Sequence, residues 1–231
     1  MKNTFADNVI HFNKNLHFTD KLPKGFGVLN PYIENEETMH TMQQFYHKFY
    51  ADNKVRKFII GINPSRHGAG VTGVPFTDTK RLESDCGIKM KSAYSHEVSS
   101  VFMYDMIKEY GGVEKFYKDI YINSPFPLAI VRKNSSGHWL NANYYDTPEL
   151  YFAVKKFMHY TLKQHFNFGL HDSLVYVLGK KNAKFIAEIN SELKLFKRIE
   201  VLEHPRYIQQ YKSKEKQLYI DKYLIALSKN D

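Results

Sequence analysis

The 231-residue sequence contains only one cysteine, Cys86. A single thiol cannot form an intrachain disulfide, a zinc site of four thiolates or an iron–sulfur cluster. Cys86 also stands in an Asp85-Cys86-Gly87 segment that is typical of a turn, without the base and electropositive surroundings that a nucleophilic cysteine needs. We therefore exclude redox and cluster chemistry.

Long apolar segments are absent as well. The longest, such as Tyr223 to Leu227, are far shorter than the ~20 residues with which a helix crosses a bilayer. Residues Met1 to Asp7 carry one lysine and lead into no apolar core, so a secretory signal is not expected. The sequence predicts a cytoplasmic protein without a membrane partner.

The motifs of several enzyme classes are missing. No Gly-x-Ser-x-Gly elbow marks a serine hydrolase, and no Gly-Lys-Ser or Gly-Lys-Thr completes a phosphate-binding loop. The histidine pairs His40/His47 and His159/His165 lack the i, i+4 spacing or the carboxylates of a helix-borne metal site. We expect no metal site and no cofactor, which leaves attack by water without a metal or a protein nucleophile.

Positive charge is in excess, since 33 basic and 24 acidic residues give a net charge of +9. An excess of this size attracts phosphate backbones or an anionic membrane surface. A composition rich in Lys, Asn, Ile, Tyr and Phe offers a second explanation, codon bias, in which the charge only solvates the surface. Composition alone supports both explanations.

The remaining composition is that of an ordinary globular protein, with 43% hydrophobic and 25% charged residues. No internal repeat and no low-complexity linker divides the chain. We interpret residues 1–231 as a single domain, with a structured unit from about residue 5 to residue 228.

Short apolar runs alternate with helical patterns along the chain. The strand-like runs are Phe58–Ile62, Ile120–Ile122, Leu174–Leu178 and Arg198–Leu202. Helical spacing is found in Glu36–Tyr50, Glu97–Tyr110, Thr147–His165, Lys181–Leu193 and Gln217–Ser228. Strands that alternate with helices require crossover connections. We therefore predict an α/β fold, a three-layer α/β/α sandwich with a central, mainly parallel four-stranded sheet.

Polar residues stand at the ends of the predicted strands, where ligands bind in such folds. Asn63 and Asn123 each follow a strand and each offer an amide donor and an amide acceptor. His204 follows the last strand, where an imidazole can donate a hydrogen bond to developing negative charge. These three residues are our candidates for a polar site at one sheet edge.

The Gly-rich stretch after the first strand matches a dinucleotide-binding fingerprint in spacing only. Gly68, Gly70 and Gly73 lie several residues past the strand and lead into Val74-Pro75, which cannot open the required helix. We interpret the stretch as a mobile pocket wall, in which glycine allows close backbone approach and Phe76 presents its ring to a flat base.

Four motifs in order make the sequence similar to uracil-DNA glycosylases: Gly61-Ile62-Asn63-Pro64, Thr72-Gly73-Val74-Pro75-Phe76, Asn123 followed by prolines, and His204-Pro205. The Thr-Gly-Val-Pro-Phe element resembles the single-strand-selective monofunctional branch. The motifs lie within residues 58–207, and the lone cysteine excludes the iron–sulfur branches of the superfamily. The resemblance implies a monofunctional glycosylase that flips uracil out of DNA and starts base excision repair.

The resemblance also implies a role for each motif residue. Asn63 positions the attacking water, and His204 stabilises the departing uracil anion. Phe76 stacks on the base, and Asn123 binds its polar edge. The implied substrate-binding set is completed by Gly61, Ile62, Pro64, Ser65 and Gly73. The implied DNA-binding set is Arg66, Lys180, Lys181, Arg206, Tyr207 and Lys212. Because Asn63 replaces the aspartate of the most active uracil glycosylases, we expect a modest rate.

The sequence departs from the family pattern at two places. Ser65-Arg66 replaces the usual Gly-Pro, beside the C5 edge of the base. The last motif, Glu203 to Tyr207, is shorter than the family's His-Pro-Ser-Pro-Arg, which predicts a reduced wedge and a divergent subgroup.

Two alternatives remain beside the glycosylase, namely a non-catalytic nucleic-acid-binding module of the same fold and an α/β hydrolase of nucleosides or nucleotides. The expected partner is uracil-containing DNA, single- or double-stranded, bound by a monomer.

Overall fold

The structure is a computed structural model that describes residues 3–91 and 93–229. Its strands are β1 (Phe26–Leu29), β2 (Arg56–Ile60), β3 (Ile120–Asn123), β4 (Ala129–Lys133), β5 (Trp139–Ala142), β6 (Leu170–Leu178) and β7 (Arg198–Leu202). Its helices are α1 (Phe5–Lys14), α2 (Pro31–Glu34), α3 (Glu36–Tyr50), α4 (Ala69–Thr72), α5 (Thr79–Ser84), α6 (Val98–Tyr110), α7 (Val113–Asp119), α8 (Pro148–Asn167), α9 (Lys180–Leu193), α10 (Pro205–Tyr211), the short 3₁₀ helix η1 (Ser213–Glu215) and α11 (Lys216–Ser228).

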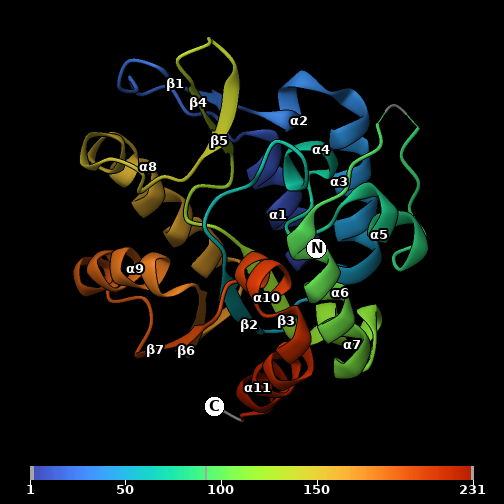
Figure 1. Ribbon diagram of the computed structural model, residues 1–231. Helices are drawn as coiled ribbons and strands as arrows, with labels where there is room; N and C mark the ends of the chain where they lie inside the picture. Colours follow the sequence, from blue (N-terminus) through green and yellow to red (C-terminus); the bar gives the residue numbers. More distant parts are fainter. Residues whose placement is uncertain (1–2, 92, 230–231) are drawn as a thin grey trace.

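The central sheet has the strand order β3-β2-β6-β7, and every neighbouring pair is parallel. The predicted α/β fold is therefore confirmed, and the described sheet is wholly parallel (Figure 1). Strand β2 ends at Ile60, two residues before the predicted end, because the ladder to β3 stops at the Ile60–Asn123 pair. Beyond this pair the chain leaves the sheet, which frees residues 61–65 for a loop.

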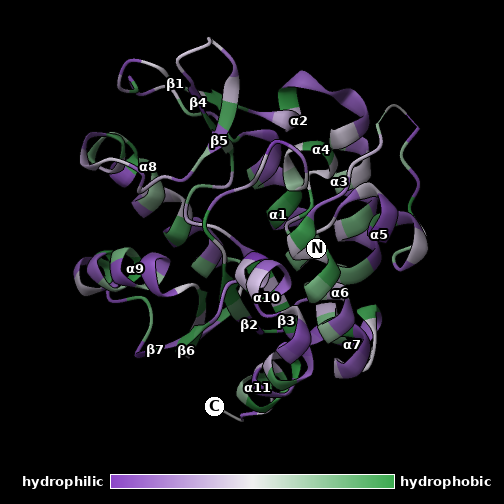
Figure 2. Cartoon of the chain, viewed as in Figure 1, coloured by the Kyte–Doolittle hydropathy of each residue, from purple (hydrophilic) through white to green (hydrophobic). Residues whose placement is uncertain are grey.

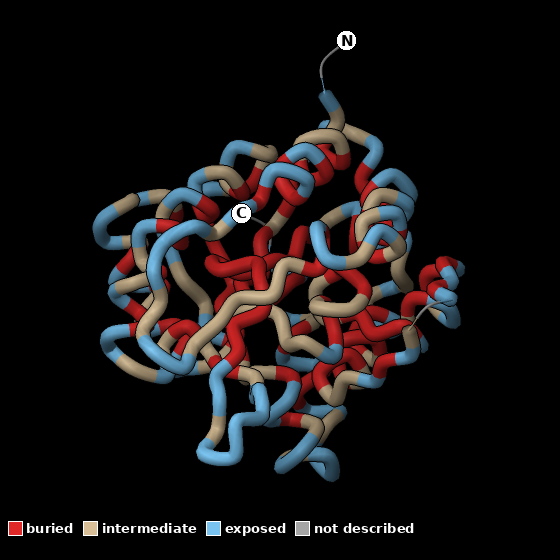
Figure 3. The backbone as a smooth tube through the Cα atoms, turned by 90° about the horizontal axis from the view of Figure 1, so that it is seen from above, coloured by how far each residue is buried: buried red, intermediate tan, exposed pale blue. Residues whose placement is uncertain are grey.

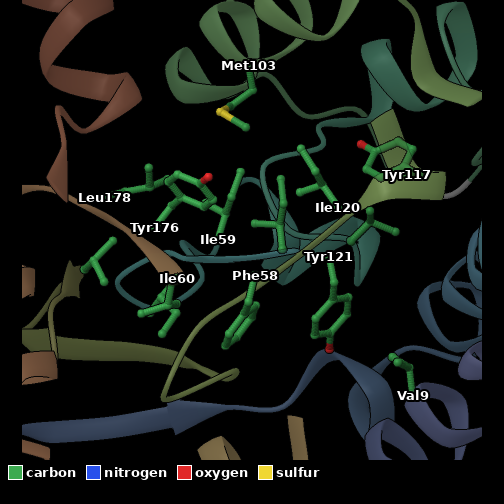
Figure 4. Packing of buried hydrophobic residues seen from close by; sticks show 14 of the residues in the cluster. Val9, Phe58, Ile59, Ile60, Met103, Tyr117, Ile120, Tyr121, Tyr176 and Leu178 are labelled. Atoms are coloured by element: carbon green, nitrogen blue, oxygen red, sulfur yellow. The ribbon is translucent and has the colours of Figure 1, made fainter. Parts of the chain in front are cut away.

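Helices cover both faces of this sheet. Phe58 and Tyr121 point to one face and stack with their ring centroids 5.5 Å apart (Figure 4). On this face Tyr121 also meets Phe5 of α1 at 5.1 Å. Tyr176 points to the other face, where its hydroxyl donates to the Ala226 carbonyl of α11 at 2.8 Å. Parallel sheets are normally covered in this way, and β2, β3 and most of β6 are buried and apolar, whereas the edge strand β7 is partly exposed (Figures 2 and 3).

A second, antiparallel sheet with the order β1-β4-β5 was not expected from the sequence. Its strand β4 begins with the buried apolar residues Ala129, Ile130 and Val131, which we did not predict to form a strand from the sequence. Trp139 and Leu140 of β5 are exposed. Pairing of Lys133 with Trp139 and of Ile130 with Ala142 forms the β4–β5 hairpin. The hairpin projects beside the carboxyl edge of the central sheet and brings residues 141–143 to the site (Figure 1).

Side-chain caps mark the starts of two of the predicted helices. The Asn35 side chain accepts from the backbone N–H of Glu37 at 2.9 Å, and α3 has the predicted bounds. Thr147 caps α8, whose first residue is Pro148, and the helix runs two residues past the predicted end.

Two short helices lie where loops were expected. α4 occupies part of the Gly-rich stretch and is closed by Gly73 at φ 71°. α10 begins directly after His204 with Pro205 at its first position. No helix within the described ranges is long and apolar enough to span a bilayer.

Candidate active site

A cavity of about 180 Å³ lies at the carboxyl edge of the central sheet, where β2, β3 and β7 end. Loops after these strands, the Gly-rich stretch and the β4–β5 hairpin all contribute to it. It is lined by Gly61, Ile62, Asn63, Pro64, Ser65, Ala69, Pro75, Phe76, Glu97, Ser99, Asn123, Ser124, Asn141, Ala142, Asn143, His204 and Arg206. The structure thus brings together both proposed catalytic residues and all proposed substrate-binding residues except Gly73.

Asn63 is held by backbone groups at the end of the hairpin. Its Nδ2 donates to the Ala142 carbonyl at 3.0 Å, and its Oδ1 accepts from the Tyr144 N–H at 3.1 Å. Because these two partners are a fixed acceptor and a fixed donor, the amide has one orientation. A second lone pair of Oδ1 remains for a water molecule.

Asn123 ends β3, and its side chain is also fixed. Its Oδ1 accepts from the Ser124 N–H at 2.8 Å, and its Nδ2 donates to the Tyr121 hydroxyl at 2.7 Å. One Nδ2 hydrogen and one Oδ1 lone pair remain unused by these contacts. The amide can therefore donate to and accept from the edge of a heterocyclic base.

Phe76 forms an aromatic wall and has an unusual backbone. Its φ is 54°, a left-handed conformation that is strained for a bulky residue. Buried Thr72 supports the turn, since its hydroxyl donates to the Thr77 carbonyl at 2.7 Å. A Cβ on Gly61 would lie 2.9 Å from the Phe76 ring, so glycine is required for the ring to lie there. Strain at a pocket wall is typical of a functional position.

His204 is the N-cap residue of α10. Its Nδ1 accepts from the Arg206 N–H at 3.2 Å, so the proton of the neutral ring is on Nε2. Burial, helped by the neighbouring Arg206 charge, lowers the pKa of His204 to about 4. The imidazole is therefore neutral at neutral pH and has an N–H to donate, and its centroid lies 5.9 Å from that of Phe76.

Glu97 is a pocket residue that the sequence did not reveal. It stands at the start of α6, and its Oε1 accepts from the Ser65 hydroxyl at 3.3 Å. A Cβ on Gly68 would lie 1.7 Å from its Oε2, so Gly68 provides the space for the carboxyl group. Burial raises the pKa of Glu97, whereas the Ser65 hydrogen bond and the Arg206 charge lower it. A lone glutamate ahead of a helix carries no motif, so only the tertiary structure identifies it.

The hairpin residues Asn141, Ala142 and Asn143 were missed for the same reason as the hairpin itself. The Asn141 Oδ1 accepts from the Arg66 N–H at 3.1 Å and so ties the hairpin to the loop after β2. Arg66 itself does not line the cavity, and its Nε donates to His67 at 3.1 Å.

Gly73 lies outside the cavity lining. At this position a Cβ would lie 3.0 to 3.1 Å from side-chain atoms of Tyr32, Met42 and Thr38. The Gly73 carbonyl accepts from the Tyr32 hydroxyl at 3.0 Å. Gly73 thus ends α4 and packs against α2 and α3 instead of lining the cavity.

The proposed DNA-binding residues are not gathered in one cluster. Arg206 lines the cavity, and Tyr207 is 44% exposed on α10. The neighbouring Tyr211 is 72% exposed, and the two tyrosine rings lie 5.7 Å apart. The last motif therefore leads into a helix with Arg206 at the cavity and two exposed tyrosines further along it, in place of the expected loop.

Lysines near the site differ in their partners. The Lys181 ammonium lies 4.6 Å from the Tyr145 ring centroid, and Lys180 lines a separate hollow between α9 and β7. Both follow Gly179, where a Cβ would lie 3.5 Å from the Cβ of His204. Lys212 forms an ion pair with Glu215 at 2.9 Å, so its charge is partly neutralised.

The described residues hold no group of three His, Cys, Asp or Glu side chains placed for a metal ion. Cys86 is fully buried, and burial raises the pKa of its thiol to about 12. The thiol is therefore protonated at neutral pH and is enclosed away from the cavity lining.

Comparison with known proteins places this geometry in a family. The sequence model of the Uracil DNA glycosylase superfamily matches residues 47–228. The chain therefore belongs to the uracil DNA glycosylase superfamily. It is similar to a crystal structure of wild-type SMUG2 from Pedobacter heparinus, with 49% sequence identity, a TM-score of 0.94 and 96% of each chain covered. No curated protein matches. The predicted family, fold and enzyme class, a monofunctional uracil-DNA glycosylase, are confirmed at this level.

Proposed function

We propose that the protein hydrolyses the N-glycosidic bond of uracil in DNA, with water as the nucleophile, and so initiates base excision repair. One observation carries the proposal. Two fixed amides, a neutral imidazole and an aromatic face meet in one cavity, and they come from Asn63, Asn123, His204 and Phe76. These groups supply what the reaction needs without an acid, a base or a protein nucleophile.

The leaving group is the uracil anion, and His204 is the residue suited to stabilise it. Glycosidic cleavage passes through a sugar with oxocarbenium character, so negative charge develops on the base. The N-cap contact leaves the Nε2–H of His204 free to donate to a base carbonyl oxygen. A neutral donor avoids the cost of burying an imidazolium before the charge develops.

Asn63 positions the water in this proposal. Its Oδ1 accepts from the Tyr144 N–H and keeps one lone pair, which can accept a hydrogen bond from water and aim it at the sugar. An amide is not a strong base, so the rate rests mainly on placement of the water and on stabilisation of the leaving group. No lysine lines the cavity among the described residues, which supports the monofunctional course.

The cavity accepts a base only after base flipping. Extrusion of a nucleotide from a duplex costs a few kcal/mol, and stacking on Phe76 offsets part of this. Arg206 lines the cavity, and Tyr207 is exposed next to it in the chain. In this proposal Arg66, Lys180, Lys181 and Lys212 provide positive charge for phosphates on single- or double-stranded DNA. The proposal further includes a single domain that acts as a monomer in the cytoplasm.

The test is incubation of the purified protein with single-stranded and duplex oligonucleotides that carry one uracil. The expected products are free uracil and an abasic site that breaks only after alkali, since a monofunctional enzyme does not cleave the strand itself. Absence of free uracil from both substrates would contradict the proposal. Release of base from deoxyuridine but not from DNA would instead support a nucleoside hydrolase.

A further inference from the structure

The orientation of the Asn123 amide decides which pyrimidine the site accepts. Uracil presents an N3–H donor and an O4 acceptor, whereas cytosine presents an N3 acceptor and an N4 amino donor. An amide that offers Oδ1 to N3 and Nδ2 to position 4 binds uracil, and the flipped amide binds cytosine. Selection of uracil therefore requires a structure that prevents the flip.

Two contacts of Asn123 hold the same orientation. The Ser124 backbone N–H donates to Oδ1 at 2.8 Å, and a backbone N–H can only donate. Nδ2 donates to the Tyr121 hydroxyl at 2.7 Å. The first contact is fixed by the peptide group, but a hydroxyl can donate or accept, so the second contact holds the amide only if the Tyr121 proton points elsewhere.

His165 of α8 stands where it can accept that proton. Its Nδ1 lies 3.2 Å from the Tyr121 oxygen, and the two groups are fully buried. With Nδ1 as the acceptor, the Tyr121 hydroxyl donates to the imidazole and offers its lone pairs to Nδ2 of Asn123. In this arrangement Asn123 donates a hydrogen bond to Tyr121, and Tyr121 donates one to His165.

The surroundings of His165 keep its ring neutral, and its Nε2 has no hydrogen-bond partner among the described residues. Rings of Phe12, Phe58 and Phe168 lie with centroids 5.0, 5.8 and 5.6 Å from the imidazole. Burial among these rings lowers the pKa of His165 to about 3, so the ring is neutral and only one nitrogen carries a proton. Tyr121 extends from β3 into this face of the sheet (Figure 4).

We propose that Tyr121 and His165 are positioning residues that lock the Asn123 amide in the orientation for uracil and against cytosine. The inference rests on the proposed function, because it assigns Asn123 to the base edge. The opposite His165 tautomer would donate to Tyr121 and turn the hydroxyl proton toward Asn123. At Tyr121 that arrangement would favour the flipped amide. At Ser124 the same flip would place Nδ2 against the backbone N–H, so that two donors would face each other.

The variant Tyr121→Phe tests the lock because it keeps the ring and removes the hydroxyl. We would measure the affinities for oligonucleotides with 2′-fluoro-2′-deoxyuridine or 2′-fluoro-2′-deoxycytidine, which resist cleavage, and the single-turnover rate of uracil release. The preference for the uracil analogue should fall roughly tenfold, the effect of one hydrogen bond, with a parallel fall in rate. His165→Phe, which removes the acceptor, should change the preference in the same direction.

Tyr176→Phe is the matched control. Its hydroxyl is equally buried and donates to a backbone carbonyl of α11, on the opposite face of the sheet from Tyr121. It should lower stability without changing the preference between the two analogues. An unchanged preference in folded Tyr121→Phe, or an equal change in Tyr176→Phe, would overturn the inference.

A second measurement does not depend on activity. The ¹⁵N spectrum of the histidine ring should show His165 of the wild-type protein with the proton on Nε2 at neutral pH, and Tyr121→Phe should weaken this tautomer preference. A proton on Nδ1 in the wild-type protein would overturn the inference. If the wild-type protein released no uracil while His165 showed the Nε2 tautomer, the proposed function would fail and the hydrogen-bonded chain would stand.

Discussion

At the scale of single residues, the protonation of His204 distinguishes the proposed mechanism from one that uses an imidazolium. The N-cap contact with the Arg206 N–H fixes the neutral tautomer, and burial moves the pKa to about 4. An imidazolium in the same place would have to be formed against this burial. The neutral ring of His204 is thus available as a hydrogen-bond donor at neutral pH.

The pH dependence of the rate follows from this pKa. Between pH 5 and pH 8 His204 stays neutral, so the single-turnover rate of uracil release should show no inflection near pH 6.5, the ordinary histidine value. The measurement is the rate across this range for the wild-type protein and for His204→Gln. An inflection near pH 6.5 that disappears in His204→Gln would contradict a neutral donor.

A buried amide at the start of α9 joins the elements that carry the site. Asn182 donates to the carbonyls of Gly61 and Leu178 at 3.0 and 3.2 Å, and its Oδ1 accepts from the Tyr144 hydroxyl at 2.6 Å. Through these contacts the loop after β2, the end of β6 and the chain after β5 share one anchor. At the scale of elements, Asn182 therefore fixes the hairpin against the sheet.

We predict that Asn182→Ala lowers the free energy of unfolding by about 2–3 kcal/mol, because several buried polar groups lose their partner. Urea denaturation of the variant measures this. Asn134→Ala removes side-chain hydrogen bonds in an exposed turn of the β4–β5 hairpin and should lower the free energy of unfolding by less. An equal decrease in the free energy of unfolding in the two variants would show that the buried Asn182 contacts stabilise the protein no more than the exposed Asn134 contacts do.

The elements differ in how well the sequence predicts them. α3 and α8 carry their signals locally, in the cap residues Asn35 and Thr147 and in helical spacing, so their starts are predictable. In the β4–β5 hairpin, buried Ile130 pairs with Ala142, but exposed Lys133 pairs with Trp139 and β5 shows no apolar alternation. Strand type in such segments is decided by tertiary contacts rather than by local pattern.

The site shows the same division. Asn63, Asn123 and His204 follow buried strands, so the rule for strand ends in parallel sheets is enough to select them. Glu97 reaches the cavity only through the packing of α6 and the space left by Gly68. Such a contact joins positions far apart in the chain, and no local signal announces it.

At the scale of the whole molecule, two histidines with lowered pKa values make stability depend on pH. Burial lowers the pKa values of His165 and His204 to about 3 and about 4, below the ordinary value of 6.5. Below pH 6.5 the unfolded chain therefore binds more protons than the folded one. Their contribution to stability is complete above pH 6.5 and is lost as the pH falls toward 4.

We predict that the free energy of unfolding decreases between pH 6.5 and pH 4, and that His165→Gln removes about 1.4 kcal/mol per pH unit of this slope, the contribution of one proton. Urea unfolding at several pH values measures the slope. If the free energy of unfolding of the variant had the same pH slope as that of the wild-type protein, His165 would not be the group that takes up a proton on unfolding.

The net charge of +9 can also be assigned to places. Lys180 and Lys181 follow Gly179, which lies close to His204, whereas Lys212 is paired with Glu215. We predict that the double variant Lys180→Ala/Lys181→Ala weakens DNA binding and reduces the slope of log Kd against log salt by about 1–2, while Lys212→Ala changes it less. Fluorescence anisotropy at several salt concentrations tests this. If the slope of log Kd against log salt is unchanged in the lysine variants, the positive charge reflects the composition of the chain and not DNA binding at these residues.

The most direct test of the central claim is single-turnover release of uracil from a single-stranded oligonucleotide at neutral pH. We expect the wild-type protein to release uracil, and we expect Asn63→Ala and His204→Ala to be slower by about 100-fold or more, because each removes one preorganised group. Circular dichroism would confirm that both variants are folded. Uracil release at the wild-type rate by the folded variants would contradict the assignment of Asn63 and His204 as catalytic residues. No release by the wild-type protein would contradict the proposed glycosylase activity.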